Sequence, residues 1–429
     1  MFEEEKFVIK GLEGKRCLSG ELKTPGAKNA VLKVLAAALL FKDEVNLANV
    51  PDIEDVSRML ELLEDLGVVV EKNSPGTYRL ITTDINSSDI SVEISKRLRA
   101  SIVLTGPLLG RLGRAAFPHP GGCVIGKRPI DFTLEGFISL GASLTEETEC
   151  YVITAPVDGL QGTEIFFKTQ SVTSTENFMM AAVLARGKTI LKNSALEPEV
   201  VSLGEFLNDC GARIEGLGTS TITIYGGELL SGQGKVYVTI PDRIAAGSFI
   251  VLAALTAEDV LVTDCRPDHL DALIYILRSM GVQLEVTDSS VRIRGRQPTF
   301  KAVDIKTHEY PGFPTDLQAP LAVLLTQSEG SSFIFETIFE NRLQYLDSIS
   351  RMGAEVKVID AHRALLTGPS KLEGKEVASP DLRAGLAYVI AAIIASGESV
   401  VHNVYYIDRG YERLEESLQA IGVDIKRVQ

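Results

Sequence analysis

The pattern of apolar and polar positions repeats six times along the chain. In each copy, apolar residues at helical spacing lead into a glycine, and residues that alternate between apolar and polar follow it. This pattern predicts a helix that ends at a glycine with positive φ and continues into a strand. The six glycines are 69 to 74 residues apart: Gly67, Gly141, Gly211, Gly281, Gly353 and Gly422.

A more strongly apolar helix is predicted at the start of each copy. The six segments are Ala30–Phe41, Ser101–Leu112, Asn177–Arg186, Ala245–Thr256, Thr315–Gln327 and Leu382–Ser396. A short β-like run usually follows, so each copy consists of helix, strand, helix and strand, with more strand completing it. Because these first helices are apolar on all sides, we expect them to be buried, with the sheets outside them.

The repeats predict an α/β protein of two domains, each built from three copies. One hydrophobic core grows inefficiently beyond about 250–300 residues, and the chain has 429. We expect a first domain at residues 28–240 and a second, discontinuous domain at residues 1–27 and 241–429. The strand-like segment Lys6–Leu22 belongs to no complete copy, and we expect it to pair with the last half of the chain.

Composition limits the classes of partner. The formal net charge of −14 argues against a broad nucleic-acid surface, which needs a basic face. The longest apolar run, Leu386–Ala395, is about half the length that spans a bilayer, and the acidic N-terminus has no apolar signal core. These features predict a cytoplasmic protein that binds neither nucleic acid nor membrane. A few convergent Lys and Arg residues are still sufficient for a small-anion pocket.

The cysteines and histidines indicate neither a disulfide framework nor a zinc site. The five cysteines are far apart and form no CxxC pair, and the five histidines show no metal-binding spacing. A reducing compartment fits this usage. Four of the cysteines are expected in apolar or strand-like surroundings: Cys17, Cys150, Cys210 and Cys265.

The fifth cysteine lies in the segment PGGCVIGKRPID at Pro120–Asp131, which combines a thiol, two cations and a carboxylate within twelve residues. Its proline and glycines predict a loop. Lys127 and Arg128 follow Cys123, and nearby cations favour the nucleophilic thiolate. Arginine also holds phosphate or carboxylate through two parallel hydrogen bonds. Taken alone, the segment indicates either a reactive thiol beside an anion site or a solvated turn with an incidental cysteine.

Together with this loop, several other motifs resemble one family, the UDP-N-acetylglucosamine 1-carboxyvinyltransferases, which are enolpyruvyl transferases. The matching segments extend over essentially the whole chain. They are PGAKNA (25–30), LRAS (98–101), EPE (197–199), PDRI (241–244), PGFPTDLQA (311–319), TIFENR (337–342), DLRA (381–384) and IDRGYERLEESLQAIGVDI (407–425). The family's EPSP synthase-like fold, two inside-out α/β barrels of three repeats each, agrees with the sixfold pattern.

The resemblance implies a particular reaction. The enolpyruvyl group of phosphoenolpyruvate is transferred to the 3-hydroxyl of UDP-N-acetylglucosamine and phosphate is released, which is the first committed step of peptidoglycan precursor synthesis. No metal or organic cofactor is implied. The donor carries a phosphate and a carboxylate, so the site needs several cations, and the acceptor hydroxyl needs a carboxylate to take its proton.

The resemblance also assigns roles to residues of this chain. Cys123, Asp316 and Lys28 are expected to be catalytic. Cys123 matches the loop cysteine that adds to phosphoenolpyruvate and is the target of fosfomycin, and Asp316 matches the carboxylate at the sugar 3-hydroxyl. The implied substrate-binding residues are Lys28, Asn29, Arg99, Arg128, Pro129, Ile130, Asp131, Phe132, Asp316, Ile338, Arg383 and Arg409.

The residues by themselves leave plainer interpretations open. Asp316 or Thr315 precedes an apolar helix, where either side chain is a good N-cap. Each arginine is equally compatible with a surface ion pair, and Phe132 and Ile338 with core packing. The matched residues are divided between the two predicted domains, so the resemblance implies that both domains contribute to the site.

Two departures from the family pattern concern the acceptor. The chain reads SVTSTEN at Ser171–Asn177 where the family usually reads SVGATEN, and Ala245 replaces the glutamate of PDRIEAG. Thr173 and Ser174 therefore stand near the expected diphosphate, where hydroxyls either add hydrogen bonds or crowd the ligand. Two alternatives stay open: transfer to a different nucleotide or nucleotide sugar, and a non-catalytic nucleotide-sugar sensor. The PGGC loop argues against the shikimate-pathway sister enzyme.

Overall fold

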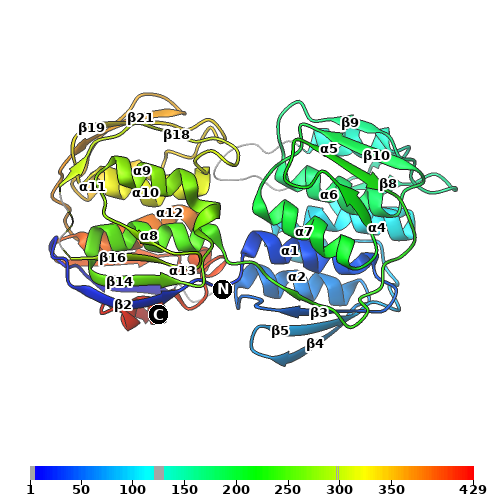
Figure 1. The fold of residues 1–429 in the computed structure, drawn as a ribbon, viewed down its shortest axis with the longest axis horizontal. Helices are drawn as coiled ribbons and strands as arrows, with labels where there is room; N and C mark the ends of the chain where they lie inside the picture. The colour runs from blue at the N-terminus through cyan, green and yellow to red at the C-terminus, as the bar shows by residue number, and fades with distance from the viewer. Residues whose placement is uncertain (1–4, 120–129, 296, 298) are drawn as a thin grey trace. The chain divides into compact units, whose positions relative to one another are not determined.

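The computed structural model describes residues 5–119, 130–295, 297 and 299–429, apart from the side chain of Arg99. The described residues form two units, and each unit has its own hydrophobic core. Unit 1 contains residues 5–25 and 241–429, and unit 2 contains residues 26–119 and 130–240. Figure 1 shows that helices fill the interior of each unit and sheets cover them.

Unit 2 contains the first three copies of the repeat. The first comprises α1 (Lys28–Ala37), η1 (Ala38–Leu40), β3 (Glu44–Ala48), α2 (Glu54–Asp65), β4 (Val69–Ser74) and β5 (Thr77–Ile81). The second comprises α3 (Val92–Ser95), η2 (Arg99–Leu104), α4 (Thr105–Leu112), β6 (Arg114–Pro118), α5 (Asp131–Ser139), β7 (Ser143–Glu146) and β8 (Cys150–Thr154). The third comprises β9 (Glu164–Phe166), α6 (Val172–Val183), β10 (Lys188–Lys192), α7 (Pro198–Asp209), β11 (Arg213–Glu215) and β12 (Thr221–Tyr225), and β13 (Val236–Val238) follows it.

Unit 1 contains β1 (Lys6–Lys10), β2 (Leu18–Lys23) and the last three copies. The fourth comprises α8 (Arg243–Thr256), β14 (Ala257–Thr263), η3 (Pro267–Leu270), α9 (Asp271–Ser279), β15 (Glu285–Val286) and β16 (Val291–Arg294). The fifth comprises β17 (Phe300–Lys301), β18 (Ile305–Lys306), α10 (Thr315–Leu325), β19 (Ser328–Phe335), α11 (Leu346–Arg351), β20 (Glu355–Val358) and β21 (Arg363–Gly368). The sixth comprises β22 (Glu376–Ala378), α12 (Leu382–Ile394), β23 (Glu398–His402), α13 (Val404–Asp408), α14 (Leu414–Ala420) and β24 (Asp424–Val428).

Each copy has its own sheet among the described residues. The strand orders in unit 2 are β13-β3-β5-β4, β6-β8-β7 and β11-β12-β10-β9. Those in unit 1 are β15-β16-β14-β2, β17-β19-β21-β20 and β22-β23-β1-β24. In every copy the last helix ends two residues before the predicted glycine, and all six glycines have φ between 92° and 112°. Because this region strains other residues, the glycines explain why each helix turns into its strand at that point.

The first helix of each copy lies inside its unit, as predicted. Every residue of α8 is buried, and α10 packs against both α8 and α12. Figure 1 shows these three helices between the β19–β21 sheet and the β14–β2 sheet. A helix that is apolar on all sides can only be stable when it is covered on all sides. The prediction of inside-out α/β barrels with three repeats each is therefore confirmed.

Two of the first helices differ from the prediction in detail. The apolar segment predicted as the first helix of the second copy begins with the 3₁₀ segment η2, because the buried Asn177 side chain accepts a hydrogen bond from Gly106 N (2.7 Å) and donates one to the Ile102 carbonyl (3.0 Å). Helix α6 starts at Val172, five residues before the predicted start. The hydroxyl of Ser171 caps it by accepting from Ser174 N at 3.3 Å.

The two N-terminal strands complete sheets of unit 1. Strand β1 lies between β23 and β24 and is antiparallel to both. Strand β2 is parallel to β14 at the edge of the fourth sheet, from Leu18 to Lys23. Phe7 and Ile9 point into the core, where they are fully buried.

A helix that crosses a membrane is long and apolar. Within the described residues, none of the helices is both long and apolar enough to do so.

Candidate active site

In unit 1, the carboxylate of Asp316 is held between two arginines. Arg342 Nη2 donates to Asp316 Oδ1 at 2.9 Å, and Arg383 Nε donates to Asp316 Oδ2 at 3.1 Å. The arginine side chains are 4% and 3% exposed, whereas the Asp316 side chain is 28% exposed. The carboxylate is therefore the accessible tip of a buried charged cluster. The structure brings together two predicted site residues here, Asp316 and Arg383.

The structure contradicts the interpretation of Asp316 or Thr315 as the cap of α10. The N-cap residue is Pro314, and no side chain caps this helix end. The Thr315 hydroxyl instead donates to Glu336 Oε2 at 2.9 Å. Both carboxylate oxygens of Asp316 accept hydrogen bonds from arginine side chains, and the N-cap position is occupied by Pro314, so helix capping does not explain the position of Asp316.

The cluster around Asp316 extends inward through Arg383. Its Nη1 donates to the Tyr411 hydroxyl at 3.0 Å, and that hydroxyl lies 3.5 Å from Ser248 Oγ on α8. Burial lowers the pKa of the Arg383 guanidinium, but Tyr411 and Asp316 raise it more, so its pKa is above the ordinary value. Arg383, on α12, therefore carries a permanent positive charge that contacts Asp316 of α10 and the Tyr411 hydroxyl.

In unit 2, the predicted anion-binding residues lie at the start of α1. Lys28 Nζ is 2.6 Å from Asp55 Oδ2 of α2, and the two side chains are 10% and 3% exposed. Asn29 is partly buried, and its carbonyl accepts a hydrogen bond from Lys33 Nζ at 2.9 Å. Lys28 is the first residue of α1, and the N-terminus of a helix favours an anion. The backbone at this helix end thus suits a phosphate or carboxylate, whereas the Lys28 ammonium is paired with Asp55 in this structure.

Lys33 also joins α1 to α6 through an ion pair. Its Nζ lies 3.2 Å from Oε2 of the fully buried Glu176. Neither oxygen of Glu176 accepts a well-aligned hydrogen bond from the described residues. Burial raises the pKa of Glu176 to about 7 against the opposing charge of Lys33, and Glu199 and Glu197 contribute to the rise. The Glu176 carboxyl group is therefore close to half protonated at neutral pH.

The raised pKa of Glu176 predicts a pH-dependent stability. A carboxyl group whose pKa is about 7 when folded and 4.5 when unfolded favours folding below pH 4.5. This contribution, at most about 3 kcal/mol, is lost as the pH rises through 7. In Glu176→Gln we expect that decline to disappear from denaturant unfolding curves measured between pH 4.5 and 8. The control is Glu164→Gln, in an exposed pair with Lys192, and an unchanged decline in Glu176→Gln would contradict the assignment.

The predicted residues at the start of α5 lie in unit 2 as well. Ile130 precedes the helix, Asp131 is exposed, and the Phe132 ring packs at 5.0 Å from the Phe167 ring. The next residue, Thr133, has its Oγ1 2.9 Å from Oγ of Ser174. This contact joins the first turns of α5 and α6.

Of the residues that depart from the family pattern, Ser174 and Ala245 are buried in this structure, whereas Thr173 is partly exposed. Ser174 is buried, and besides Thr133 its hydroxyl accepts a hydrogen bond from Ser171 Oγ at 3.0 Å. Ala245 is fully buried in the core of unit 1, and its backbone N–H donates to the N-cap Asp242 at 3.0 Å. Both side chains are therefore used in packing α6 and α8, and neither is an exposed group at a surface.

The remaining predicted residues are placed as follows. Ile338 is partly buried, and its N–H donates to Glu336 Oε1 at 2.9 Å. Arg409 follows α13 and is partly buried. Arg99 begins η2, and its side chain is not described. Cys123, Lys127, Arg128 and Pro129 lie outside the described residues.

The other cysteines differ in exposure. Cys210 and Cys265 are buried, and burial raises the pKa of each thiol to about 11. Burial and the charge of Glu147 raise the pKa of Cys150 on β8. Cys17 is exposed in the loop before β2, so the prediction of apolar or strand-like surroundings is wrong for this residue. Cys17 directly follows Arg16, and the apolar residue after it, Leu18, is already the first residue of β2.

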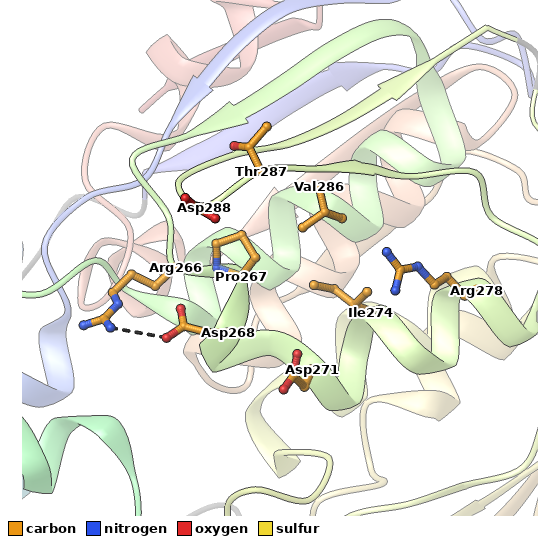
Figure 2. Close-up of a pocket in the computed structure, with 9 residues that line it drawn as sticks. All are labelled: Arg266, Pro267, Asp268, Asp271, Ile274, Arg278, Val286, Thr287 and Asp288. Atoms are coloured by element: carbon orange, nitrogen blue, oxygen red, sulfur yellow. Dashed lines mark hydrogen bonds and ion pairs between the residues drawn. The ribbon is translucent and has the colours of Figure 1, made fainter.

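Unit 1 also has a surface pocket of about 450 Å³ between η3, α9 and the β15–β16 turn. Figure 2 shows Arg266, Asp268 and Arg278 among its lining side chains. Arg266 Nη2 donates to Asp268 Oδ2 at 3.2 Å, so part of this charge is neutralised within the pocket. None of the predicted site residues lines it. This pocket is therefore separate from the Asp316 cluster.

Sequence reasoning assigned no role to several residues of these clusters. Arg342 belongs to the TIFENR motif, but nothing in the motif shows which carboxylate it meets. Asp55 is an ordinary first-turn acid of α2. Lys33 and Glu176 are charged residues inside apolar helices, and this was an available signal, since such residues are rarely buried without a partner.

Comparisons with known proteins agree with this architecture. The solved structure of the enolpyruvyl transferase NikO from Streptomyces tendae superposes with a TM-score of 0.87 at 23% identity and covers 99% of both chains. An EPSP synthase from Acinetobacter baumannii gives a TM-score of 0.73 at 19% identity over the full length of both chains. The family model of EPSP synthase (3-phosphoshikimate 1-carboxyvinyltransferase) matches residues 12–418. The fold is therefore that of the enolpyruvyl transferases.

Related sequences identify the family to which the chain belongs within the enolpyruvyl transferases. A UDP-N-acetylglucosamine 1-carboxyvinyltransferase from Desulforapulum autotrophicum is 45% identical over 99% of this chain and 100% of the relative. A protein of the same name from Solibacter usitatus is 45% identical with the same coverage. The chain belongs to the UDP-N-acetylglucosamine 1-carboxyvinyltransferase family of enolpyruvyl transferases.

Proposed function

We propose that the protein transfers the enolpyruvyl group of phosphoenolpyruvate to the 3-hydroxyl of UDP-N-acetylglucosamine and releases phosphate. The observation that carries the proposal is the 45% identity, over nearly the full length of both chains, to relatives named for this activity. The motif residues Lys28, Asn29, Asp316 and Arg383 are present in arrangements that suit the reaction. In the cell, this reaction would supply peptidoglycan precursor synthesis.

The reaction is an addition followed by an elimination. The acceptor hydroxyl oxygen bonds to C2 of phosphoenolpyruvate while C3 takes up a proton, which gives a tetrahedral ketal. Loss of phosphate and of a C3 proton restores the double bond. The acceptor is a weak nucleophile until its proton has a base to move to.

Asp316 is the proposed base for the acceptor hydroxyl. Its carboxylate is the exposed end of the cluster with Arg342 and Arg383. Both guanidinium groups favour the ionised carboxylate, which is the form that accepts a proton. They also fix its orientation, so a hydroxyl that approaches from the exposed side meets an oriented acceptor.

Lys28 is the proposed cation for the donor. Its ammonium group is buried beside Asp55, where charges interact more strongly than in water. Asn29, Arg99, Arg128 and Arg409 are the further proposed contacts to the donor's phosphate and carboxylate. Pro129, Ile130, Asp131, Phe132 and Ile338 are the proposed contacts to the nucleotide sugar.

A phosphate-release assay tests the proposal. The purified protein should release phosphate from phosphoenolpyruvate when UDP-N-acetylglucosamine is added, and should not do so with either substrate alone. Release with another nucleotide sugar but not with this one would instead favour a different acceptor. Binding of the nucleotide sugar without release of phosphate would favour a sensor, and would overturn the proposal.

Cys123 is proposed as the reactive thiol, and fosfomycin labelling tests this assignment. We expect a brief treatment to modify Cys123, because Lys127 and Arg128 follow it in sequence. The buried Cys210 and Cys265 are expected to stay unmodified, since each has a pKa of about 11. Peptide mass mapping identifies the site.

The exposed Cys17 is the internal control for accessibility alone. An adduct on Cys17 in place of Cys123 would contradict the assignment. Cys123→Asp is expected to retain turnover and to escape alkylation, because a carboxyl group also carries a proton but does not open the epoxide in the same way.

A further inference from the structure

Arg342 is the arginine of the Asp316 cluster to which the sequence assigned no role. It lies in the segment that follows β19, and its side chain is 4% exposed. Its guanidinium carbon lies 5.8 Å from the centre of the Phe339 ring, and the backbone N–H of Arg342 donates to the Phe339 carbonyl at 3.3 Å. The backbone of Arg342 is thus held within its own segment, and its buried guanidinium lies beside the Phe339 ring where it reaches Asp316.

The same segment is attached to the first turn of α10 at a second point. The fully buried Glu336 accepts hydrogen bonds from the N–H groups of Ile338 (2.9 Å) and Phe339 (3.2 Å) and from the Thr315 hydroxyl (2.9 Å). Thr315 is the residue before Asp316. The segment from Glu336 to Arg342 therefore holds both the backbone and the carboxylate at this end of α10.

The two arginines hold different oxygens of the carboxylate. A carboxylate has about four lone-pair directions, and the hydrogen bonds from Arg342 and Arg383 use one on each oxygen. Both guanidinium groups are buried, whereas Asp316 is 28% exposed, so they hold the inner side of the group. A single hydrogen bond would leave the carboxylate free to rotate about its last bond, whereas two bonds to fixed partners prevent this.

We propose that Arg342 is a positioning residue for the transfer reaction and acts by orienting the Asp316 carboxylate toward the acceptor hydroxyl. This inference rests on the proposed function. Arg342 contributes to turnover through Asp316 and not through a contact of its own with either substrate. Its loss therefore lowers kcat more than it raises KM, and it has little effect once Asp316 can no longer accept a proton.

The test is a double-mutant cycle with steady-state kinetics on the full-length protein. Arg342→Gln is expected to lower kcat by about 10–100-fold, since a misplacement of about 1 Å costs about 10²-fold. The KM for each substrate should change by less than about threefold. In the Asp316→Asn background, the same substitution should lower kcat by less than about threefold, because residues that act as a unit are not additive.

Two further variants keep the result interpretable. Arg342→Lys retains the charge without the planar fork and is expected to recover part of the lost kcat. Arg292→Gln removes an arginine that makes bonds of 2.6 and 2.7 Å to Asp259 on the outer sheet of the same unit, and it is expected to leave kcat unchanged. Melting curves show whether each variant is folded at the assay temperature.

Each outcome is decisive. If Arg342→Gln behaves like Arg292→Gln, or lowers kcat equally in both Asp316 backgrounds, the positioning role is wrong. A large rise in KM with kcat unchanged also overturns it, because this would indicate direct substrate binding. If the unmodified protein releases no phosphate with phosphoenolpyruvate and UDP-N-acetylglucosamine, the proposed function itself is wrong, and the inference is overturned with it.

Discussion

Asp316→Asn is expected to lower turnover by about 10²–10⁴-fold, the usual contribution of a positioned base. The amide still accepts a hydrogen bond from a hydroxyl but cannot take its proton. Substrate KM should therefore change less than kcat. Phosphate release at saturating substrate concentrations measures the effect. Near-normal turnover would show that Asp316 is not the base and has only a structural role.

The structure also predicts a stability cost for this substitution that the sequence did not suggest. Interpreted as a helix cap, Asp316→Asn would be nearly neutral, because Asn caps helices as well as Asp. Because two buried guanidinium groups hold the Asp316 carboxylate, the substitution should instead lower the free energy of unfolding by about 1–3 kcal/mol. The matched control is Asp259→Asn, an exposed aspartate that also faces two arginines, Arg292 and Arg294. Kinetics measured well below the melting temperature separate the two effects.

Lys28→Met is expected to lower kcat by about 10²–10³-fold, comparable to the loss of one preorganised donor at a developing charge. The substitution also leaves Asp55, whose side chain is 3% exposed, without its ion-pair partner. Breaking a buried pair costs about 3–5 kcal/mol, so a lower melting temperature should accompany the loss.

Lys28→Arg separates these consequences, because it keeps the charge opposite Asp55 but alters the shape presented to the anion. We expect it to retain the melting temperature while kcat still falls. Lys192→Met, which removes an exposed ion pair with Glu164 in the same unit, should change neither quantity. If Lys28→Met turned over normally, the donor phosphate would need another cation.

The architecture could be predicted because local sequence patterns determine it. Each of the six glycines marks a helix end by a conformation that only glycine adopts readily, and the apolar first helices could only be interior. The 3₁₀ segment η2 was not predictable, because its geometry depends on Asn177, which is 71 residues away from its partner Gly106. Local periodicity carries no information about such a contact.

The candidate site was predicted only in part, for a related reason. Motifs indicated Lys28 and Asp316, but not the partners that determine how each behaves. Asp55 and Arg342 are 27 and 26 residues from those partners in sequence, a separation at which no periodic rule brings side chains together. The buried charge of Glu176 was visible as an exception within an apolar helix, but its pairing with Lys33 depends on how α1 and α6 pack.

The position of β1 between β23 and β24 has a consequence for how the protein is made. From Lys10 to Glu398, the chain requires about 20–80 s of synthesis at typical rates of about 5–20 residues per second. During this time β1 has no partner strand, and its apolar core of Phe7, Val8 and Ile9 is a potential site of misassociation. Lys6 and Lys10 flank these residues. Their charges oppose pairing with other nascent chains until β23 and β24 emerge.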